Sequence, residues 1–190
     1  MLFLASLSPR RHQLLKQIGV EFEPLDVAVD ENWDGNEHPH KHVERLALEK
    51  ALAGKSKINV TDPFAILGAD TAVVLDDVVL GKAENREQAI AMLTQLSGRT
   101  HHVFSSVALV TESRELVATS VSRVCFRPLS SVEIESYCGT DEPIDKAGGY
   151  AIQGRAAAFI ERLEGSYSGV MGLPLYETAN LLRSAGYSVR

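Results

Sequence analysis

The chain has 190 residues, 45% of them hydrophobic and 23% charged, which is the balance of a globular protein with a substantial core. Its 19 Lys and Arg against 25 Asp and Glu leave a formal net charge of −6, which argues against a basic surface for a nucleic acid polymer. No apolar run is long enough to span a membrane, and the N-terminal "MLFLASLSPRR" carries its basic residues after its apolar part, the reverse of a signal peptide. We therefore expect one cytoplasmic domain over residues 1–190, without a membrane partner and with Cys125 and Cys138 as reduced thiols.

The first half of the chain alternates strands and helices. The apolar residues 2–5 predict a buried strand, after which Ser8 is a candidate N-cap and Pro9 a candidate first residue of a helix. This order leaves unpaired N–H groups at the helix start, which suit an anion. The other elements expected here are a strand over 21–29, a helix over 42–55, hairpin strands over 64–75 and 78–82, and a helix over 86–97 capped by Asn85.

The second half begins with two long alternating stretches, 100–111 and 116–129, which predict antiparallel strands. Ser130 and Glu133 form a candidate capping box for the following helix. The Gly-rich "DKAGGYAIQG" precedes an expected strand over 156–165 and a last helix over 175–186. The whole pattern predicts an α/β fold with a mixed, strongly twisted sheet flanked by helices.

One acidic residue, Asp70, interrupts the apolar strand "AILGADTAVVL". A carboxylate in such a run is costly to desolvate unless it is paired, hydrogen-bonded or bound to a metal. Asp70 is therefore a candidate metal ligand or general base on a rigid strand. The alternative is a turn carboxylate that accepts hydrogen bonds from nearby backbone N–H groups.

Four basic residues are candidates for a phosphate site. Arg10 and Arg11 fall in the first turn of a helix, where the helix dipole disfavours cations and a bound phosphate would supply the counter-charge. Ordinary solvated arginines are the alternative. Lys82, at a strand end, and Lys50, on the apolar side of a helix, are weaker candidates because both positions commonly extend an ammonium into water.

Two loops carry further polar candidates. Gln153, in "GGYAIQG", has an amide that can pair with a donor and an acceptor on one nucleobase edge, or can simply face water. The "HPHKH" segment at 38–42 lacks Cys or carboxylates at metal-ligand spacing, so we expect it to be solvated. Trp33 nearby would either cover a base or pin its loop.

Six blocks occur in the order found in the Maf family of nucleoside triphosphate pyrophosphatases: "SLSPRR", "ERLALEKA", "ILGADT", "LSGRTH", "DKAGGYAIQG" and "EGSYSGVMGLPL". The chain resembles this family from Leu2 to its last helix. The resemblance implies an inosine-triphosphatase-like fold, hydrolysis of a nucleoside triphosphate to the monophosphate and pyrophosphate, a divalent metal cation (Mg²⁺ or Mn²⁺) and a homodimer. It also implies a role in clearing non-standard or modified nucleotides.

The same resemblance assigns roles to residues. Asp70 matches the proton acceptor that activates the attacking water, and Glu31 matches an acidic site residue that would join Asp70 as a metal ligand. The polar and basic positions that the resemblance places around the phosphates are Ser8, Arg10, Arg11, Lys50 and Lys82.

Three positions resemble the subgroup that acts on dTTP and UTP: Arg10 after Ser-Pro, Thr71 after Asp70, and Gln153. The subgroup that acts on 7-methyl-GTP tends to have Trp, Gln and Glu there. That activity, and a nucleotide-binding regulator of septum formation and cell division, are the alternatives. The regulator ranks lower because a pure sensor would not need Asp70 and Glu31 in a cationic pocket.

Overall fold

A computed structural model describes residues 1–33, 35–59 and 63–189 of the chain. The strands of these residues form one mixed sheet in the order β2-β1-β3-β5-β6-β7, with β4 paired to β3. The strands are β1 (Leu2–Leu4), β2 (Glu23–Pro24), β3 (Ala65–Leu75), β4 (Val78–Leu80), β5 (Thr100–Thr111), β6 (Glu115–Phe126) and β7 (Ile160–Glu164). The helices are α1 (Pro9–Gln17), α2 (Pro39–Lys55), α3 (Arg86–Leu96), α4 (Ser131–Cys138), the 3-10 helix η1 (Arg155–Phe159), α5 (Tyr167–Met171) and α6 (Leu175–Ser184).

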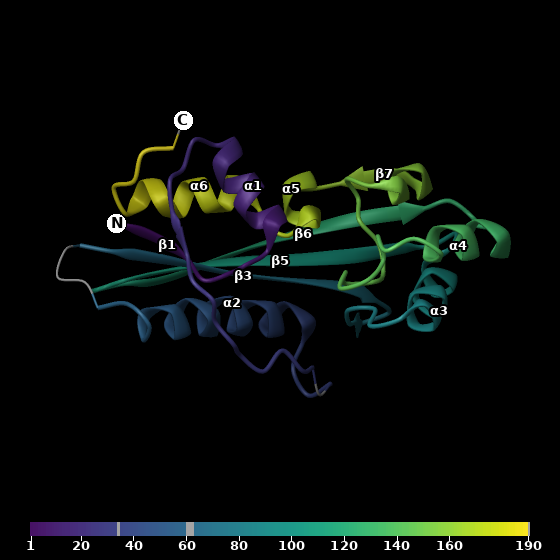
Figure 1. Ribbon diagram of the computed structural model, residues 1–190, viewed down its shortest axis with the longest axis horizontal. Coiled ribbons are helices and arrows are strands. Elements are labelled where there is room, and N and C mark those ends of the chain that lie inside the picture. The colour runs from purple at the N-terminus through teal and green to yellow at the C-terminus, as the bar shows by residue number, and fades with distance from the viewer. Residues whose placement is uncertain (34, 60–62, 190) are drawn as a thin grey trace.

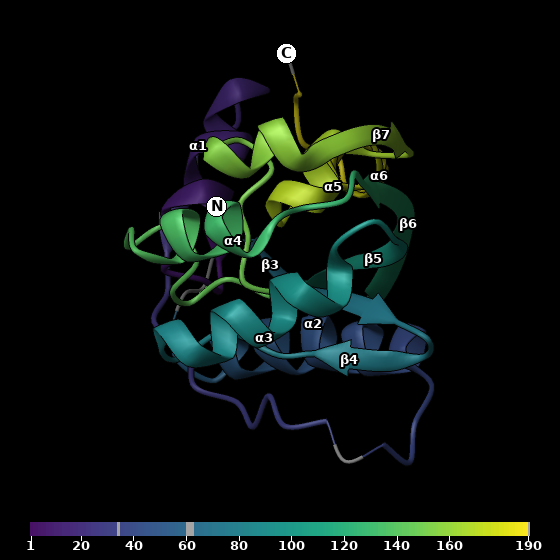
Figure 2. The same ribbon diagram turned by 90° about the vertical axis from the view of Figure 1, so that its right-hand side faces the viewer.

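The long strands β3, β5 and β6 run the length of the molecule, and helices cover both faces (Figure 1). Helix α2 packs on one face against β3 and β5, while α1, α5 and α6 lie over the other. The helices α3 and α4 gather with β7 at the far end, which Figure 2 shows from that side. The mixed, helix-flanked sheet that the sequence predicts is therefore confirmed.

Side chains of neighbouring residues point to opposite faces of the central strands, as strand geometry requires. On β3, Leu67 packs toward the side of α1 and α6, whereas Ile66 packs with Ala47 and Ala51 of α2. Both faces of these strands are therefore buried, which is why β3 reads as an almost continuous apolar run.

Local signals in the sequence place most element ends correctly. Asp76 and Asp77 have φ of 51° and 63°, the left-handed backbone that a two-residue hairpin turn needs between β3 and β4. The Asn85 side chain accepts a hydrogen bond from the Gln88 N–H at the start of α3. Ser130 and Glu133 form the predicted capping box of α4.

The structure differs from the sequence-based expectations at four places. Strand β2 is only two residues long and ends in Pro24, which cannot donate a ladder hydrogen bond. Helix α2 begins earlier than predicted, because the His38 side chain caps it and Pro39 suits its first turn. Residues Arg155–Phe159 form the 3-10 helix η1 instead of the start of a strand. Helix α5 was not predicted; Ser166 caps it.

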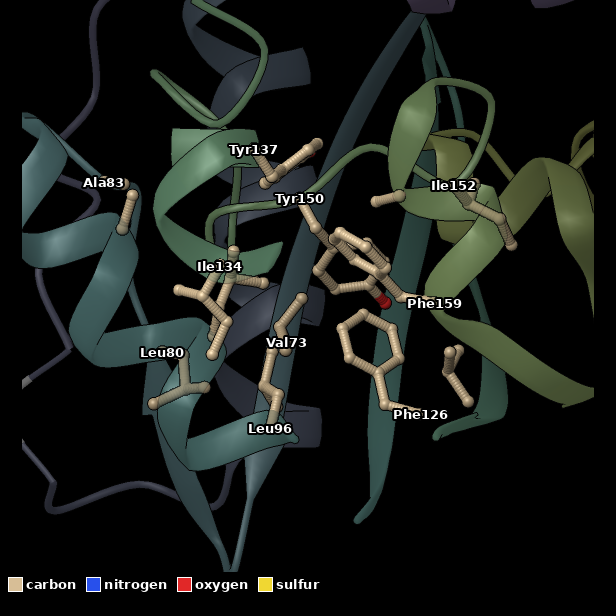
Figure 3. Close-up of a cluster of buried hydrophobic side chains, with 14 of the residues drawn as sticks. Val73, Leu80, Ala83, Leu96, Phe126, Ile134, Tyr137, Tyr150, Ile152 and Phe159 are labelled. Carbon is tan, nitrogen blue, oxygen red and sulfur yellow. The ribbon is translucent and has the colours of Figure 1, made fainter. Parts of the chain in front are cut away.

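A cluster of aromatic side chains forms the core under α3, α4 and the Gly-rich loop (Figure 3). Phe126 contacts the rings of Tyr150 and Phe159 edge to face, and Tyr137 contacts Phe159 in the same way. Such pairs stabilise the fold beyond simple area burial. The cluster fixes the backbone on either side of the loop that carries Gln153.

Gly68 allows α2 to lie directly on β3. A Cβ atom built on Gly68 would be 2.1 Å from the Ala47 carbonyl oxygen and 2.6 Å from the Ala51 backbone nitrogen. No side chain fits in that space, since both obstacles are helix backbone. The close approach brings Lys50 of α2 beside Asp70, two residues after Gly68 on β3.

We predict that Gly68→Ala lowers the free energy of unfolding by about 3 kcal/mol or more, because the methyl group must push α2 off the sheet. Urea unfolding measures the loss. The matched control is Gly81→Ala, whose added Cβ meets nothing within 4 Å and should change stability by less than about 0.5 kcal/mol. Equal stability of the two variants would contradict the prediction.

Candidate active site

A cavity of about 450 Å³ lies where the start of α1, the middle of β3, the end of β4 and the Gly-rich loop meet. All the sequence-predicted site residues line it: Ser8, Arg10, Arg11, Glu31, Lys50, Asp70, Thr71, Lys82 and Gln153. A second hollow of about 410 Å³, lined by Trp33 among others, adjoins it and shares Glu31, Asp70 and Lys82. The fold therefore brings together residues that are spread over most of the chain.

Lys50 connects the two carboxylates of the cavity. Its Nζ atom donates to Asp70 Oδ1 at 2.7 Å and lies 2.5 Å from Glu31 Oε1. The Lys50 and Asp70 side chains are only 8% and 11% exposed, so each charge depends on the other. Lys50 is therefore not a solvated ammonium, which was the alternative for this residue. Asp70 is paired with Lys50 and is not a turn carboxylate that depends on backbone N–H groups.

Glu31 lies in the loop before α2, and its carboxylate pairs with a second lysine in addition to Lys50. Lys82 Nζ donates to Glu31 Oε2 at 2.6 Å. Burial by itself raises the pKa of Glu31, but the hydrogen bonds and charges of Lys50 and Lys82 outweigh it and bring the pKa from 4.5 to about 2. Glu31 is therefore ionised at neutral pH.

The two arginines of α1 are held by backbone carbonyls of a distant segment. Arg10 Nε donates to the Met171 carbonyl at 3.3 Å, and Arg11 Nε donates to the Gly172 carbonyl at 2.9 Å. Burial lowers the pKa of both guanidinium groups, although Asp70 and Glu31 partly offset this for Arg11. A cation whose charged form is disfavoured in this way gains stability from an added anion.

Three polar side chains of the cavity keep hydrogen-bonding capacity for a ligand. Ser8 is the N-cap residue of α1, but its side chain makes no capping hydrogen bond. Thr71 is half-buried, with its Oγ1 atom 2.6 Å from Ser105 Oγ on β5. Gln153 is exposed to the cavity, and within the described part of the chain no side chain bonds its amide.

Two cavity residues were missed by the sequence reasoning, Lys146 and Tyr150. Burial, reinforced by the charge of Arg10, lowers the pKa of Lys146, so this ammonium also suits an anion. Tyr150 Oη is hydrogen-bonded to His101 Nε2 at 2.8 Å. Burial, with a smaller contribution from His102, lowers the pKa of His101 to about 4, so its ring is neutral. The one sequence signal for both missed residues was their place in "DKAGGYAIQG": Lys146 precedes the two glycines, and Tyr150 lies between them and Gln153.

The His38–His42 segment is only partly as expected. His42 in the first turn of α2 is buried and not solvated, and its Nδ1 atom is hydrogen-bonded to Glu37 at 2.9 Å. Trp33 Nε1 donates to the Glu37 carbonyl at 3.0 Å, so Trp33 pins its loop. Among the described residues, no three His, Cys, Asp or Glu side chains come close enough to bind a metal by themselves.

The donor set of the cavity nevertheless fits one divalent cation of the magnesium type. Such a cation commonly takes one or two carboxylates and completes its shell with substrate phosphates and water. Glu31 and Asp70 supply two hard carboxylates, both turned toward Lys50 Nζ and thus toward one point of the cavity. Softer ligands are absent from the residues that line the described cavity, apart from the Met171 thioether.

The chain matches the family model described as Maf-like protein over residues 1–185. It belongs to the Maf-like protein family. It is 55% identical over 185 residues to a dTTP/UTP pyrophosphatase of Alkalilimnicola ehrlichii, with 95% of this chain and 91% of the relative covered. It is 51% identical over 197 residues to a dTTP/UTP pyrophosphatase of Aromatoleum aromaticum, with 98% and 96% covered. The resemblance read from the six sequence blocks is thereby confirmed.

A solved structure supports the fold of this family member. The Ham1 protein of Staphylococcus aureus superposes with a TM-score of 0.52 at 12% identity, covering 97% of this chain and 96% of that one. At this identity the likeness concerns the fold alone. Among the described helices, none combines the length and the apolar character needed to cross a bilayer.

The low pKa of Glu31 predicts how stability responds to acid. Its carboxylate contributes stability that is fully present above pH 4.5 and is lost as the pH falls toward about 2. The stability difference between the unsubstituted chain and Glu31→Gln should therefore shrink over that range. Urea unfolding at several pH values measures it, with the exposed Glu21→Gln as control. A difference that stays constant down to pH 2 would contradict the assigned ion pairs.

Proposed function

We propose that this chain hydrolyses nucleoside triphosphates, with dTTP and UTP preferred, to the nucleoside monophosphate and pyrophosphate. The observation that carries the proposal is one carboxylate, Asp70, held rigidly on β3 in a cavity lined by Arg and Lys side chains. The names of the relatives, dTTP/UTP pyrophosphatases at 50% identity or more, support the same reaction.

The triphosphate would be bound by cations from three segments of the chain. Arg10 and Arg11 come from the start of α1, where free backbone N–H groups also favour an anion. Lys82 follows β4 and Lys146 lies in the Gly-rich loop, and the pairing of Lys82 with Ala147 brings these two segments together. A polyanion between these groups would supply the opposite charge that offsets the effect of burial on the pKa of Arg10, Arg11 and Lys146.

Asp70 would take the proton of the attacking water. Its Oδ1 atom accepts from Lys50, which leaves Oδ2 to face the water. As the water oxygen bonds to phosphorus, its proton passes to Asp70 and the anhydride bond to the pyrophosphate group breaks. Lys50 holds the carboxylate in one orientation, and the strand fixes its distance from the phosphates.

Glu31 and Asp70 would together hold a divalent cation, Mg²⁺ or Mn²⁺, when the nucleotide is bound. Such a cation neutralises charge that develops on the phosphate oxygens. Lys82, which pairs with Glu31 alone, would turn toward the phosphates, whereas Lys50 would stay paired with Asp70. The neighbouring hollow beside Trp33 offers room on the Glu31 side.

Base preference would come from three residues that line the same cavity, Arg10, Thr71 and Gln153. The edge of uracil or thymine has an N–H donor between two carbonyl acceptors, and an amide can pair with both kinds of group. The exposed Gln153 amide is free to do so. A homodimer, which the family resemblance implies, remains a proposal. One cytoplasmic domain over residues 1–190, which the length and composition indicate, remains one as well.

The first test is Asp70→Asn with pyrophosphate release from dTTP, UTP, CTP, GTP and 7-methyl-GTP in Mg²⁺ or Mn²⁺. We expect the unsubstituted chain to turn over dTTP and UTP fastest. The variant should lose about 10³-fold in kcat because an amide cannot take the proton. UTP binding should persist or tighten, since a negative charge beside the phosphates is gone.

Activity retained in Asp70→Asn would contradict its role as proton acceptor. Tight nucleotide binding without turnover of any nucleotide by the unsubstituted chain would favour a nucleotide-binding regulator. Fastest turnover of 7-methyl-GTP would move the chain to the other subgroup.

The second test is Gln153→Glu. An ionised carboxylate can only accept hydrogen bonds, so it cannot donate one to a carbonyl of uracil or thymine. We therefore expect kcat/KM for dTTP and UTP to fall about tenfold. The control is Gln95→Glu, an exposed substitution on α3 away from the cavity, which should leave kcat/KM unchanged. Unchanged preference in Gln153→Glu would show that this amide does not read the base.

A further inference from the structure

The segment that carries Gln153 is held on both sides of that residue by side chains that do not line the cavity. Before it, the Ala151 N–H donates to Tyr137 Oη at 3.3 Å. After it, the Arg155 N–H donates to Glu142 Oε2 at 3.0 Å. The backbone of Gln153 is therefore fixed by two hydrogen bonds from outside the cavity.

One carboxylate connects these attachments. Glu142 Oε1 accepts from Tyr137 Oη at 3.0 Å and from the Ala156 N–H at 3.4 Å. Burial, together with the charge and hydrogen bond of Glu142, raises the pKa of Tyr137, so the phenol keeps its proton and donates it. Hydrogen bonds to an ionised group are the strong ones, and here three donors converge on one carboxylate.

Gly154 leaves the space that the Glu142 carboxylate occupies. A Cβ atom on Gly154 would lie 2.2 Å from Oε1, 2.4 Å from Cδ and 2.6 Å from Oε2 of Glu142. The backbone of Gly154 is extended, with φ of −105°, which other residues adopt without strain. The glycine is therefore required by the approach of the carboxylate and not by its own conformation.

The carboxylate also takes the place of a helix cap. Helix η1 begins at Arg155, its N-cap residue is Gly154, and that residue has no side chain to bond the first N–H groups. Glu142 bonds two of them from the loop after α4. Tyr150 and Ile152, just before Gln153, are buried in the same cluster as Tyr137 (Figure 3).

We propose that Glu142 is a positioning residue for base selection, which it exerts through the backbone on either side of Gln153. The inference rests on the proposed function, in which the Gln153 amide reads the base. Glu142 does not touch the nucleotide; with Tyr137 it fixes where the amide is presented. We call Glu142 and Tyr137 together the bracket. Its loss should leave the residues around the phosphates in place.

The test compares Glu142→Gln and Tyr137→Phe with the unsubstituted chain, using initial rates of pyrophosphate release from UTP and CTP. We expect KM for UTP to rise about tenfold in Glu142→Gln, with kcat changed much less, because a hydrogen bond to a charged group is lost. The preference for UTP over CTP should fall by a similar factor. Tyr137→Phe should shift both quantities in the same direction, and the exposed Glu135→Gln on α4 should shift neither.

A second pair of variants tests the contact itself. Gly154→Ala should weaken UTP selection, because its methyl group overlaps the Glu142 carboxylate. In the Glu142→Ala background the same methyl group meets no carboxylate, so Gly154→Ala should add no further loss. Such strong non-additivity is expected only of residues in direct contact.

A merely structural role would lower the melting temperature and reduce turnover of UTP and CTP by equal factors. That result, or an unchanged KM and preference in Glu142→Gln, would overturn the proposal. Additive losses in the Gly154 and Glu142 pair would overturn it as well.

Hydrogen exchange separates this inference from the proposed function. The N–H groups of Ala151, Arg155 and Ala156 should exchange faster in Glu142→Gln, whether or not any nucleotide is hydrolysed. If the unsubstituted chain released no pyrophosphate, the proposed function would be wrong. The exchange rates would still show whether Glu142 and Tyr137 hold this segment. Unchanged exchange rates at these three N–H groups would contradict the positioning role of Glu142 and leave the proposed function untouched.

Discussion

The arrangement of the site depends on the ion pair between Lys50 and Asp70, which joins helix α2 to strand β3. Two buried charges are stable only when each has its partner, so the helix cannot slide along the strand without leaving one charge unpaired. Gly68 makes the pair possible, because it lets the helix backbone touch the strand. The same pair orients the Asp70 carboxylate toward the cavity, so the constraint that anchors the helix also prepares the proposed proton acceptor.

Around this anchor, the cavity is assembled from segments that have little structure of their own. The Glu31 loop is held by two ammonium groups, and the arginines of α1 by the carbonyls of Met171 and Gly172. The Gly-rich loop is hydrogen-bonded to the end of β4, where the Gly148 N–H donates to the Gly81 carbonyl. Each functional segment is therefore tied to a distant one, which allows a rigid sheet to position side chains that loops alone would leave mobile.

Asp70 and the start of α1 could be recognised from the sequence because their signals are local. A carboxylate in an apolar strand and arginines in the first turn of a helix both contradict ordinary preferences, and such conflicts commonly mark functional sites. Lys146, Tyr150 and Glu142 could not be recognised in this way. Their place in or beside a Gly-rich segment does not show which groups they contact. That depends on the packing of this loop against β4, α4 and the aromatic cluster.

The sequence by itself determined the order of most elements, the two long strands, the hairpin turn at Asp76 and Asp77, and the family. Each of these depends on residues that are close together in the sequence: alternating side chains, turn residues and motif blocks. The tertiary structure alone decided that Lys50 is a buried partner and not a solvated ammonium, since that depends on the approach of α2 to β3. It also decided that His42 is buried against Glu37 and that residues before β7 form a 3-10 helix. In each case the deciding contact joins segments whose proximity only the folded chain creates.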